Sequence, residues 1–379
     1  MASGLPKNIE AIALVNEGDF DVINKIVIPI PTPEHDQLLI KVEYSGITFA
    51  DNCFRTGINP VDKWPHILGE EALGKIVSLP PSPVAVLGRE YKKRGFSVGQ
   101  RVVVKATSQM AEYAVCRWTR AIPLPDTISP ENAVPMPTQM YTAFMLVEKV
   151  YEIKRGDFVL IHSVAREFGL SLLQMAKLRG ATVIGMVSTP ANAYIARTHG
   201  ADHVVLRGYT NVVDRVLTIT GGQGVHVSYD SVDKDRAEVE SDVRMIKQNG
   251  TIVVVGNVSS PRARPTPSAS PPTTISNGIK ICRPVIHDYL ERPAEYLDCA
   301  QKANTLVSKG FLQPRIHAVI PFTSEAVRQA ERDLLGGNTT VSSHVKRCHH
   351  RLAQSTIFLL GSHRSITIHQ VRSWRNSGD

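Results

Sequence analysis

Long apolar segments are missing from this chain of 379 residues. No stretch approaches the roughly 18 apolar residues that a membrane-spanning helix needs. The first residues, Met-Ala-Ser-Gly-Leu-Pro-Lys-Asn, also lack the apolar core of a secretory signal. These absences predict a soluble, cytoplasmic protein with no membrane partner.

Cysteine is scarce and scattered. A disulfide framework or a structural zinc site would need paired or regularly spaced cysteines. The chain has neither arrangement among its five cysteines, which are Cys53, Cys116, Cys282, Cys299 and Cys348. The pattern favours free thiols in a reducing compartment.

Acidic residues are nearly absent from the end of the chain. From Val341 onward, six basic residues and one acidic residue, Asp379, contribute +5 of the net charge of +8. Five of the thirteen histidines also lie there, in no arrangement that predicts a tetrahedral metal site. We interpret residues 341–379 as a divergent, solvated basic tail. Such a tail supports only non-specific, salt-sensitive binding, so a nucleic acid is not an expected partner.

The composition, 42% hydrophobic and 21% charged, is that of a globular protein long enough for two domains. Residues 1–138 contain short alternating or β-branched segments that glycine, proline and aspartate separate. This pattern predicts an antiparallel barrel with strands at residues 9–15, 37–44, 74–77, 101–104 and 112–115. Residues 137–150 predict a helix that links the two domains.

From residue 156 onward, predicted strands alternate with helices. The strands are expected at residues 158–162, 182–187, 203–206, 225–229 and 251–255. This alternation is typical of an α/β domain with a doubly wound parallel sheet. We assign residues 139–280 to this second domain and residues 281–340 to a return to the first. The Pro-, Ser- and Thr-rich residues 260–274 predict a surface loop.

The segment Ile161-His-Ser-Val-Ala-Arg-Glu-Phe-Gly-Leu170 lies between a predicted strand and a predicted helix. In such a turn, the N–H groups at the start of the helix bind a dinucleotide pyrophosphate, and glycines let the backbone approach it. Only Gly169 of the G-x-G-x-x-G spacing is present, with Val164 and Arg166 in the other two places. The pattern predicts a dinucleotide-binding fold and leaves open two outcomes, altered cofactor binding or its loss.

Eight further segments follow one another in a specific order. They are Ser45-Gly-Ile-Thr-Phe-Ala-Asp51, Gly69-Glu-Glu-Ala-Leu-Gly74, Val98-Gly-Gln-Arg-Val102, Gln139-Met-Tyr-Thr-Ala143, Thr220-Gly-Gly-Gln-Gly-Val225, Tyr229-Asp-Ser-Val232, Gly256-Asn257 and Arg283-Pro284. Together they resemble the zinc-free quinone oxidoreductases of the medium-chain dehydrogenase/reductase superfamily, the group that includes zeta-crystallin. The resemblance runs from about residue 10 to residue 340.

The resemblance implies a GroES-like antiparallel barrel joined to a Rossmann domain. It also implies NADPH as the cofactor, a quinone or an α,β-unsaturated ketone as the small-molecule substrate, and a homodimer. Sister groups of the superfamily bind a catalytic zinc through a Cys and a His. Thr48 and Glu70 occupy those two places here, so hydride transfer without a metal is expected.

Four residues of the first domain are implied at the catalytic site: Thr48, Asp51, Cys53 and Arg55. Thr48 stands where the family usually has Asn, and Cys53 where many members have Tyr. Asp51 and Arg55 are retained. Two roles stay open for them: an internal ion pair that positions the loop, and direct catalysis.

The implied cofactor-binding residues are Gln139, Thr142, Ala165, Arg166, Glu167, Phe168, Gly169, Ser188, Asn192, Ser231, Val232, Asn257 and Arg283. Arg166 and Glu167 replace two glycines, so their side chains would crowd the pyrophosphate unless Arg166 pairs with a phosphate. Gln139 and Thr142 contact the nicotinamide side or cap and pack the helix, and Arg283 faces the cofactor or forms a structural salt bridge.

Cofactor preference follows from the segment at residues 186–190. An NAD-selective enzyme places a carboxylate there against the ribose 2′-hydroxyl. No acidic residue occurs in this segment, so NADPH is expected in preference to NADH. Asn192 stands where relatives often carry a phosphate-binding Lys, which lowers the expected affinity.

Two other functions stay open. One is an enoyl reductase that acts on a polyketide or acyl intermediate, and the other is a degenerate relative that serves as a binding protein. After Gly337-Asn-Thr-Thr340 the closing apolar strand of the family is not recognisable. We therefore expect the last strand to be missing and an edge of the first domain to be exposed.

Overall fold

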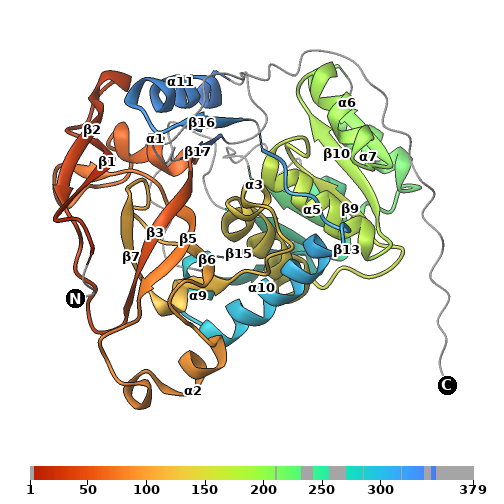
Figure 1. The fold of residues 1–379 in the computed structure, drawn as a ribbon. Coiled ribbons are helices and arrows are strands. Elements are labelled where there is room, and N and C mark those ends of the chain that lie inside the picture. Colours follow the sequence, from red (N-terminus) through yellow and green to blue (C-terminus); the bar gives the residue numbers. More distant parts are fainter. Residues whose placement is uncertain are drawn as a thin grey trace. The chain divides into compact units, whose positions relative to one another are not determined.

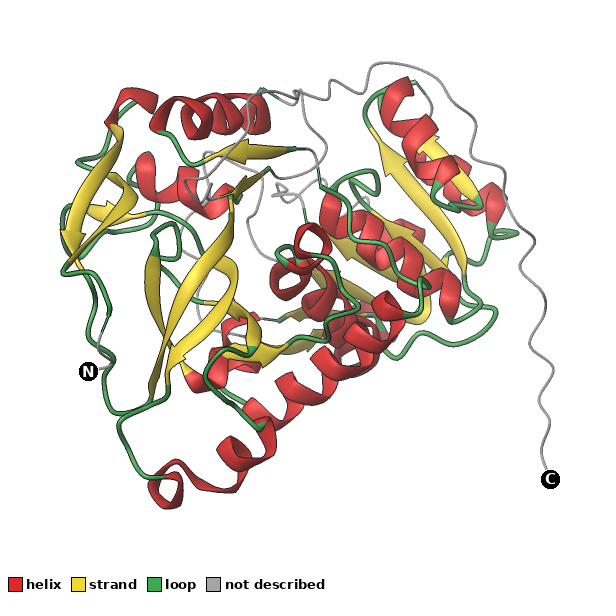
Figure 2. Ribbon diagram, in the orientation of Figure 1, coloured by secondary structure: helices red, strands yellow, loops and turns green. Residues whose placement is uncertain are grey.

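The computed structural model describes residues 4–209, 211–231, 242–255, 270–284, 286–316, 318–336 and 343–346. All of these residues belong to one compact unit that ends at Arg347. Within this unit the chain forms two lobes, the first with a three-stranded and a seven-stranded sheet and the second with one seven-stranded sheet (Figures 1 and 2). No helix in the described ranges has both the length and the apolar character needed to cross a lipid bilayer.

Antiparallel strands form the first lobe. Its strands are β1 (Asn8–Leu14), β2 (Ile23–Pro29), β3 (Gln37–Gly46), β4 (His66–Ile67), β5 (Glu71–Ser78), β6 (Arg101–Lys105), β7 (Tyr113–Arg117) and β8 (Ala121–Pro123). Strand β1 pairs with β2 and β4, while β3 pairs with β5 and β7, and β6 joins β5 to β8. The five strands predicted from sequence are confirmed within a few residues, whereas β2, β4 and β8 were not predicted.

The helical segments of this lobe are short. They are a 3₁₀ turn at Phe20–Val22, α1 (Phe49–Arg55), α2 (Val84–Arg94) and a 3₁₀ turn at Trp118–Arg120. Strand β6 shows how the lobe is packed. Val102 and Val104 join one apolar cluster inside the lobe, whereas Val103 points the other way, into the main core. This alternation follows from the two-residue period of a strand, and it explains why both faces of β6 are buried.

A continuous helical stretch links the lobes. It follows α3 (Pro130–Ala133) and comprises π-helical turns at Met136–Tyr141 and Leu146–Val150 on either side of α4 (Thr142–Met145). The linking helix predicted at residues 137–150 is thus confirmed. Its buried side chains, among them Tyr141 and Phe144, share one core cluster with Leu73 of the first lobe and Leu173 of the second. The cluster therefore spans both lobes.

A mainly parallel sheet forms the second lobe. In order across the sheet, its strands are β11 (His203–Leu206), β10 (Thr182–Val187), β9 (Phe158–Ile161), β12 (Val225–Asp230), β13 (Ile246–Val254), β15 (Lys280–Arg283) and β14 (Ser270–Thr274). The described helices are α5 (Glu167–Leu178), α6 (Pro190–Thr198), α7 (Val212–Ile219), α9 (Ile286–Leu290) and α10 (Pro293–Ser308), with a 3₁₀ turn at Ser276–Gly278. Figure 1 shows α5 lying against β9. The predicted doubly wound sheet is confirmed.

Part of the predicted surface loop at residues 260–274 is a strand. Residues 260–269 lie outside the described residues, but β14 pairs antiparallel to β15, with Ser270 opposite Arg283 and Thr274 opposite Lys280. The prolines in β14 lack a backbone N–H. They are tolerated because β14 is the edge strand of its sheet. The loop prediction failed because a proline-rich composition does not exclude an edge strand.

The chain returns to the first lobe later than predicted. We placed the return at residue 281, yet β15 pairs in parallel with β13, at Ile281 opposite Ile252. Helix α10 then packs on the linking helix, where the rings of Tyr296 and Tyr141 meet edge to face with their centres 5.8 Å apart. The return is made by β16 (Val319–Pro321) and α11 (Ser324–Leu335), which pack against the first lobe.

The predicted boundary of the basic tail at residue 341 is also corrected. Strand β17 (His344–Lys346) lies between β16 and β3, antiparallel to β3, so the closing strand is present and covers the edge of β3. Val345 is only 1% exposed. A strand of three residues is too short to give a periodic sequence signal, which is why it was missed. The rest of the tail, from residue 347, lies outside the described residues.

Candidate functional site

Thr48 and Asp51 begin α1 and connect two loops of the first lobe. The Asp51 carboxylate accepts the Thr48 N–H through Oδ2 and the Gly69 N–H through Oδ1, both at 2.8 Å. Burial raises the pKa of Asp51 to about 6, against the lowering effect of these two hydrogen bonds. Both carboxylate oxygens are engaged with backbone, so Asp51 positions the loops.

Of the two roles left open for Asp51 and Arg55, the ion pair between them is not formed, because Arg55 has another carboxylate partner. Arg55 Nε donates to Glu331 Oε2 at 3.1 Å, and this carboxylate comes from α11. Arg55 also donates to Asn52 Oδ1 and lies over the ring of Phe20, 4.2 Å from its centre. Sequence could not show that a buried carboxylate 276 residues later would reach α1. The contacts of Arg55 fasten α1 to α11.

Cys53 is a buried thiol. Desolvation raises its pKa to about 11, with the neighbouring carboxylates of Glu70 and Asp51 adding to the rise. The thiol is therefore neutral near pH 7 and a poor nucleophile. We find no chemical role for Cys53 beyond filling space on the buried side of α1.

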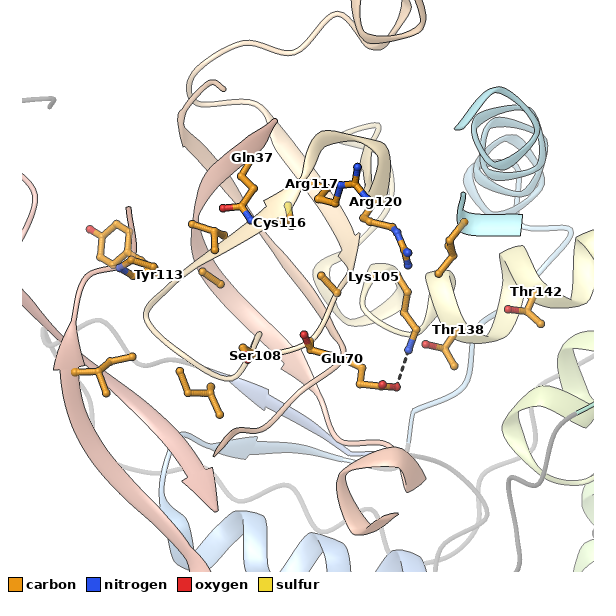
Figure 3. Close-up of a pocket in the computed structure, with 18 residues that line it drawn as sticks. Gln37, Glu70, Lys105, Ser108, Tyr113, Cys116, Arg117, Arg120, Thr138 and Thr142 are labelled. Atoms are coloured by element: carbon orange, nitrogen blue, oxygen red, sulfur yellow. Dashed lines mark hydrogen bonds and ion pairs between the residues drawn. The ribbon is translucent and has the colours of Figure 1, made fainter. Parts of the chain in front are cut away.

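A cavity of about 670 Å³ opens in the first lobe (Figure 3). Glu70, Lys105 and Tyr113 line it from the first lobe, and Thr138 and Thr142 line it from the linking helix. None of the four predicted catalytic residues, Thr48, Asp51, Cys53 and Arg55, is among its lining residues.

Glu71 is buried and next to Glu70 in the chain, but it is not among the residues that line the cavity. Its carboxylate accepts the hydroxyl of Thr138. Burial raises the pKa of Glu71 to about 7, although Lys105 and Thr138 act in the opposite direction. The carboxyl group of Glu71 thus titrates near neutral pH, close to the cavity.

The turn after β9 carries the predicted cofactor-binding residues of the second lobe. A Cβ atom on Gly169 would lie 2.6 Å from Ser163 O and 2.7 Å from Val164 Cα, both backbone atoms. The close packing predicted for Gly169 is therefore confirmed. Ala165 is buried and Phe168 is half-buried.

The start of α5 has the features of an anion site. No side chain caps this helix, and the backbone N–H groups of Phe168 and Gly169 make no hydrogen bond to any described residue. Arg166 precedes the helix, is exposed, and forms no side-chain hydrogen bond or ion pair within the described ranges. Two open N–H groups beside an exposed guanidinium fit a phosphate group.

Glu167 is the acidic residue in the first turn of α5, and its negative charge disfavours the binding of an anion there. Its Oε2 accepts Gln139 Nε2 at 2.8 Å, so the side chain is held toward the linking helix. This contact joins Gln139 of the linking helix to the start of α5, a pairing that was not predicted from sequence. Thr142 is fully buried, with its hydroxyl 3.5 Å from the carbonyl oxygen of Pro137, an arrangement in which Thr142 packs the helix and lines the cavity.

The remaining predicted cofactor residues follow the carboxyl ends of strands in the second lobe. Ser188 is exposed after β10, Asn192 is half-buried in α6, Ser231 follows β12, and Arg283 is the exposed last residue of β15. Parallel strands bring such positions to one edge of the sheet. Val232 and Asn257 lie outside the described residues.

Three residues of this region were not singled out from sequence. The N–H of Arg207 donates to the carbonyl of Val187 at 2.8 Å, which places Arg207 beside Ser188 at the ends of β10 and β11. Lys105 and Thr138 line the cavity. Arg207 follows β11 in the parallel sheet, and that position is the signal that could have identified it. A lone lysine at the end of the antiparallel strand β6 gives no such signal.

Two family models match the chain. "Alcohol dehydrogenase GroES-like domain" matches residues 34–126, and "Zinc-binding dehydrogenase" matches residues 168–302. Among curated proteins, a quinone oxidoreductase from Pseudomonas aeruginosa is 31% identical, over 79% of this chain and 87% of that protein. One from Salmonella typhimurium is 29% identical, over 86% of this chain and 96% of that protein.

Solved structures show the same fold. Mycobacterial Rv1454c, complexed with NADPH, superposes with a TM-score of 0.77 at 27% identity, covering 89% of this chain and 99% of that one. The quinone oxidoreductase of Escherichia coli, also complexed with NADPH, gives a TM-score of 0.75 at 26% identity with the same coverage.

Proposed function

Because the chain belongs to the quinone oxidoreductase family of the medium-chain dehydrogenase/reductase superfamily, we propose that it is an NADPH-dependent oxidoreductase. Its substrate is a quinone or an α,β-unsaturated ketone, and the reaction needs no metal. The observation that carries the proposal is that two consecutive residues of the linking helix connect the cavity of the first lobe with the start of α5 in the second. Thr138, which lines the cavity, donates to Glu71, and Gln139 donates to Glu167, the first residue of α5.

The turn after β9 and the strand ends beside it hold the cofactor. The open N–H groups of Phe168 and Gly169 and the guanidinium of Arg166 bind the pyrophosphate. Arg207, beside Ser188, provides positive charge where a ribose 2′-phosphate would lie. Bound there, the nicotinamide supplies the hydride. The protein aligns the substrate and stabilises the charge that develops on its oxygen.

The ion pair of Glu70 supports a reaction without a metal, because Glu70 stands where sister groups have a zinc ligand. Its carboxylate is paired with the Lys105 ammonium, whose Nζ lies 2.9 Å from Glu70 Oε2. Two clusters of potential metal ligands occur in the described part of the chain, and neither includes Thr48, Cys53 or Glu70.

Cofactor titration tests the proposal directly. NADPH is added to the purified protein while nicotinamide fluorescence is followed, and quinone-dependent oxidation of NADPH is then measured. Saturable binding together with quinone-dependent turnover is expected. Absence of saturable binding at millimolar NADPH would refute the assignment.

NADPH is expected to be used better than NADH by about tenfold or more, the worth of one retained phosphate contact. Ser188→Asp should erase this preference, because a carboxylate would then face the 2′-phosphate. The comparison is of kcat/KM for both cofactors. Thr198→Asp, which adds the same charge at the far end of α6, is the control and should keep the preference. Equal kinetics in the unmodified protein would contradict the prediction.

Arg166→Gly distinguishes two roles of this side chain. Since Arg166 is exposed beside the open N–H groups, we expect it to pair with a phosphate, and its loss should weaken NADPH binding by roughly 1.5 to 3 kcal/mol. If the side chain instead crowds the pyrophosphate, the same substitution tightens binding. Glu167→Gly, which removes a negative charge from the helix start, should tighten binding. Fluorescence titration gives the sign of each change.

A further inference from the structure

Lys105 ends β6 with its ammonium group at the cavity. The side chain is 15% exposed and that of Glu70 is 25% exposed. Nζ donates to Glu70 Oε2 at 2.9 Å and makes no second hydrogen bond within the described ranges. An ammonium group carries three N–H bonds, so two of them remain available. Figure 3 shows Lys105 directed toward Glu70, with Thr138 of the linking helix nearby.

Carboxyl groups surround this ammonium. Glu70 contacts it, and Glu71 and Asp51 lie close enough to influence its titration. Burial alone would lower the pKa of Lys105, but these carboxylates outweigh burial and raise it above its ordinary value. Lys105 is therefore charged at neutral pH.

Other polar groups of the site are already engaged. Both oxygens of the Asp51 carboxylate accept backbone N–H groups, and the Thr138 hydroxyl donates to Glu71. Arg117, at the other side of the cavity, is paired with Asp36 at 2.7 Å. Arg120, which also lines the cavity, is paired with Glu291. Lys105 is therefore a cation of the cavity wall, beside Thr138 of the linking helix, that has donors left for a ligand oxygen.

We propose that Lys105, held in place by Glu70, binds the oxygen of the substrate's conjugated carbonyl and gives it a proton. This assignment rests on the proposed function. The substrate gains on carbon the hydride that reduced nicotinamide supplies, and the electron pair of its π system moves to the carbonyl oxygen. An N–H bond of Lys105 breaks while an O–H bond forms, and the neutral amine regains its proton from water. The donor acts where negative charge develops, which is the most effective position for it.

The first test uses 4-nitrophenol without any cofactor, since its phenolate resembles the reduced oxygen and absorbs visible light. Bound beside Lys105, it should ionise with a pKa at least one unit below its value in solution. Lys105→Met should abolish this shift and Lys105→Arg should retain most of it. Lys75→Met is the matched control, because Lys75 lies on β5 and pairs with Glu43 at 3.8 Å. It should behave like the unmodified protein.

The second test separates this assignment from the proposed function. Lys105→Met should lower kcat for quinone reduction about a hundredfold or more, with NADPH affinity unchanged. If Lys105→Met does not fold, Lys105→Gln, which still reaches Glu70, takes its place. No 4-nitrophenol binding, or an equal pKa shift in the variant, would overturn the role of Lys105. If the pKa of 4-nitrophenol shifts in a way that depends on Lys105 but the protein binds no NADPH, the proposed function is wrong and the role of Lys105 as an oxyanion-binding group stands.

Discussion

A chain that ends after Ser342 is expected to lose its folded first lobe, whereas a chain that ends after Arg347 should fold with nearly full stability. The difference is β17, which lies between β3 and β16. Burial of Val345 in the core with Ile12 and Leu68 contributes about 1.5 to 3 kcal/mol. Several strand hydrogen bonds add about 1 kcal/mol each. The sum is a large share of a typical stability of about 5 to 15 kcal/mol.

Urea unfolding of the two truncated chains, followed by circular dichroism, measures this difference. Val345→Asp in the full chain should give a similar loss, because it places a charge in the same apolar cluster. The chain that ends after Arg347 should also keep its NADPH affinity within about a factor of three, well under 1.4 kcal/mol. Equal stability of the two truncated chains would show that β17 contributes nothing.

Gly169→Val is expected to destabilise the second lobe and to remove most cofactor affinity. The added Cβ would lie within 3 Å of the backbone of Ser163 and Val164. Because backbone atoms cannot rotate away, α5 must move off β9, at a cost of about 3 kcal/mol or more. The N–H groups of Phe168 and Gly169 move with it, so NADPH binding should weaken more than tenfold.

Leu178→Ala serves as the control for this substitution. Leu178 ends the same helix and is largely exposed, so its removal should change stability by about 0.5 kcal/mol or less. Gly169→Ala should fall between the two variants. Thermal unfolding and NADPH titration of all three variants provide the comparison. A Gly169→Val protein with unchanged melting temperature and affinity would mean that the turn can relax without loss.

Periodicity predicted most of the fold. The strands of the second lobe were placed closely because buried parallel strands such as β9 and β10 give continuous apolar runs. Two of the failures are short strands without a periodic signal: β17 has three residues, and the proline-rich composition of β14 resembles a loop. Nothing local in residues 344–346 indicates that they pair with β3, and nothing in β14 indicates that it borders β15.

The site was predicted less completely than the fold. The turn residues could be proposed because they are contiguous. The contact of Gln139 with Glu167 was not predicted, since Gln139 was expected to contact the nicotinamide side or to cap and pack the helix. The pairing of Arg55 could not be deduced, since Glu331 arrives from α11. Lys105 was missed because a lone lysine after a strand carries no motif. Its proposed role depends on Glu70, and only the fold shows that Glu70 Oε2 lies 2.9 Å from Lys105 Nζ.

The pairing of β17 with β3 also affects the order in which the two lobes can fold during synthesis. The partners of Tyr44 to Gly46 in β17 are synthesised about 300 residues later in the chain. At roughly 5 to 20 residues per second, about 15 to 60 seconds separate the two. The second lobe has all its described strands by Arg283 and can fold on the ribosome first. Translation that stops between these points leaves the end of β3 paired with β5 on one side only, and an open strand edge of that kind can recruit other chains.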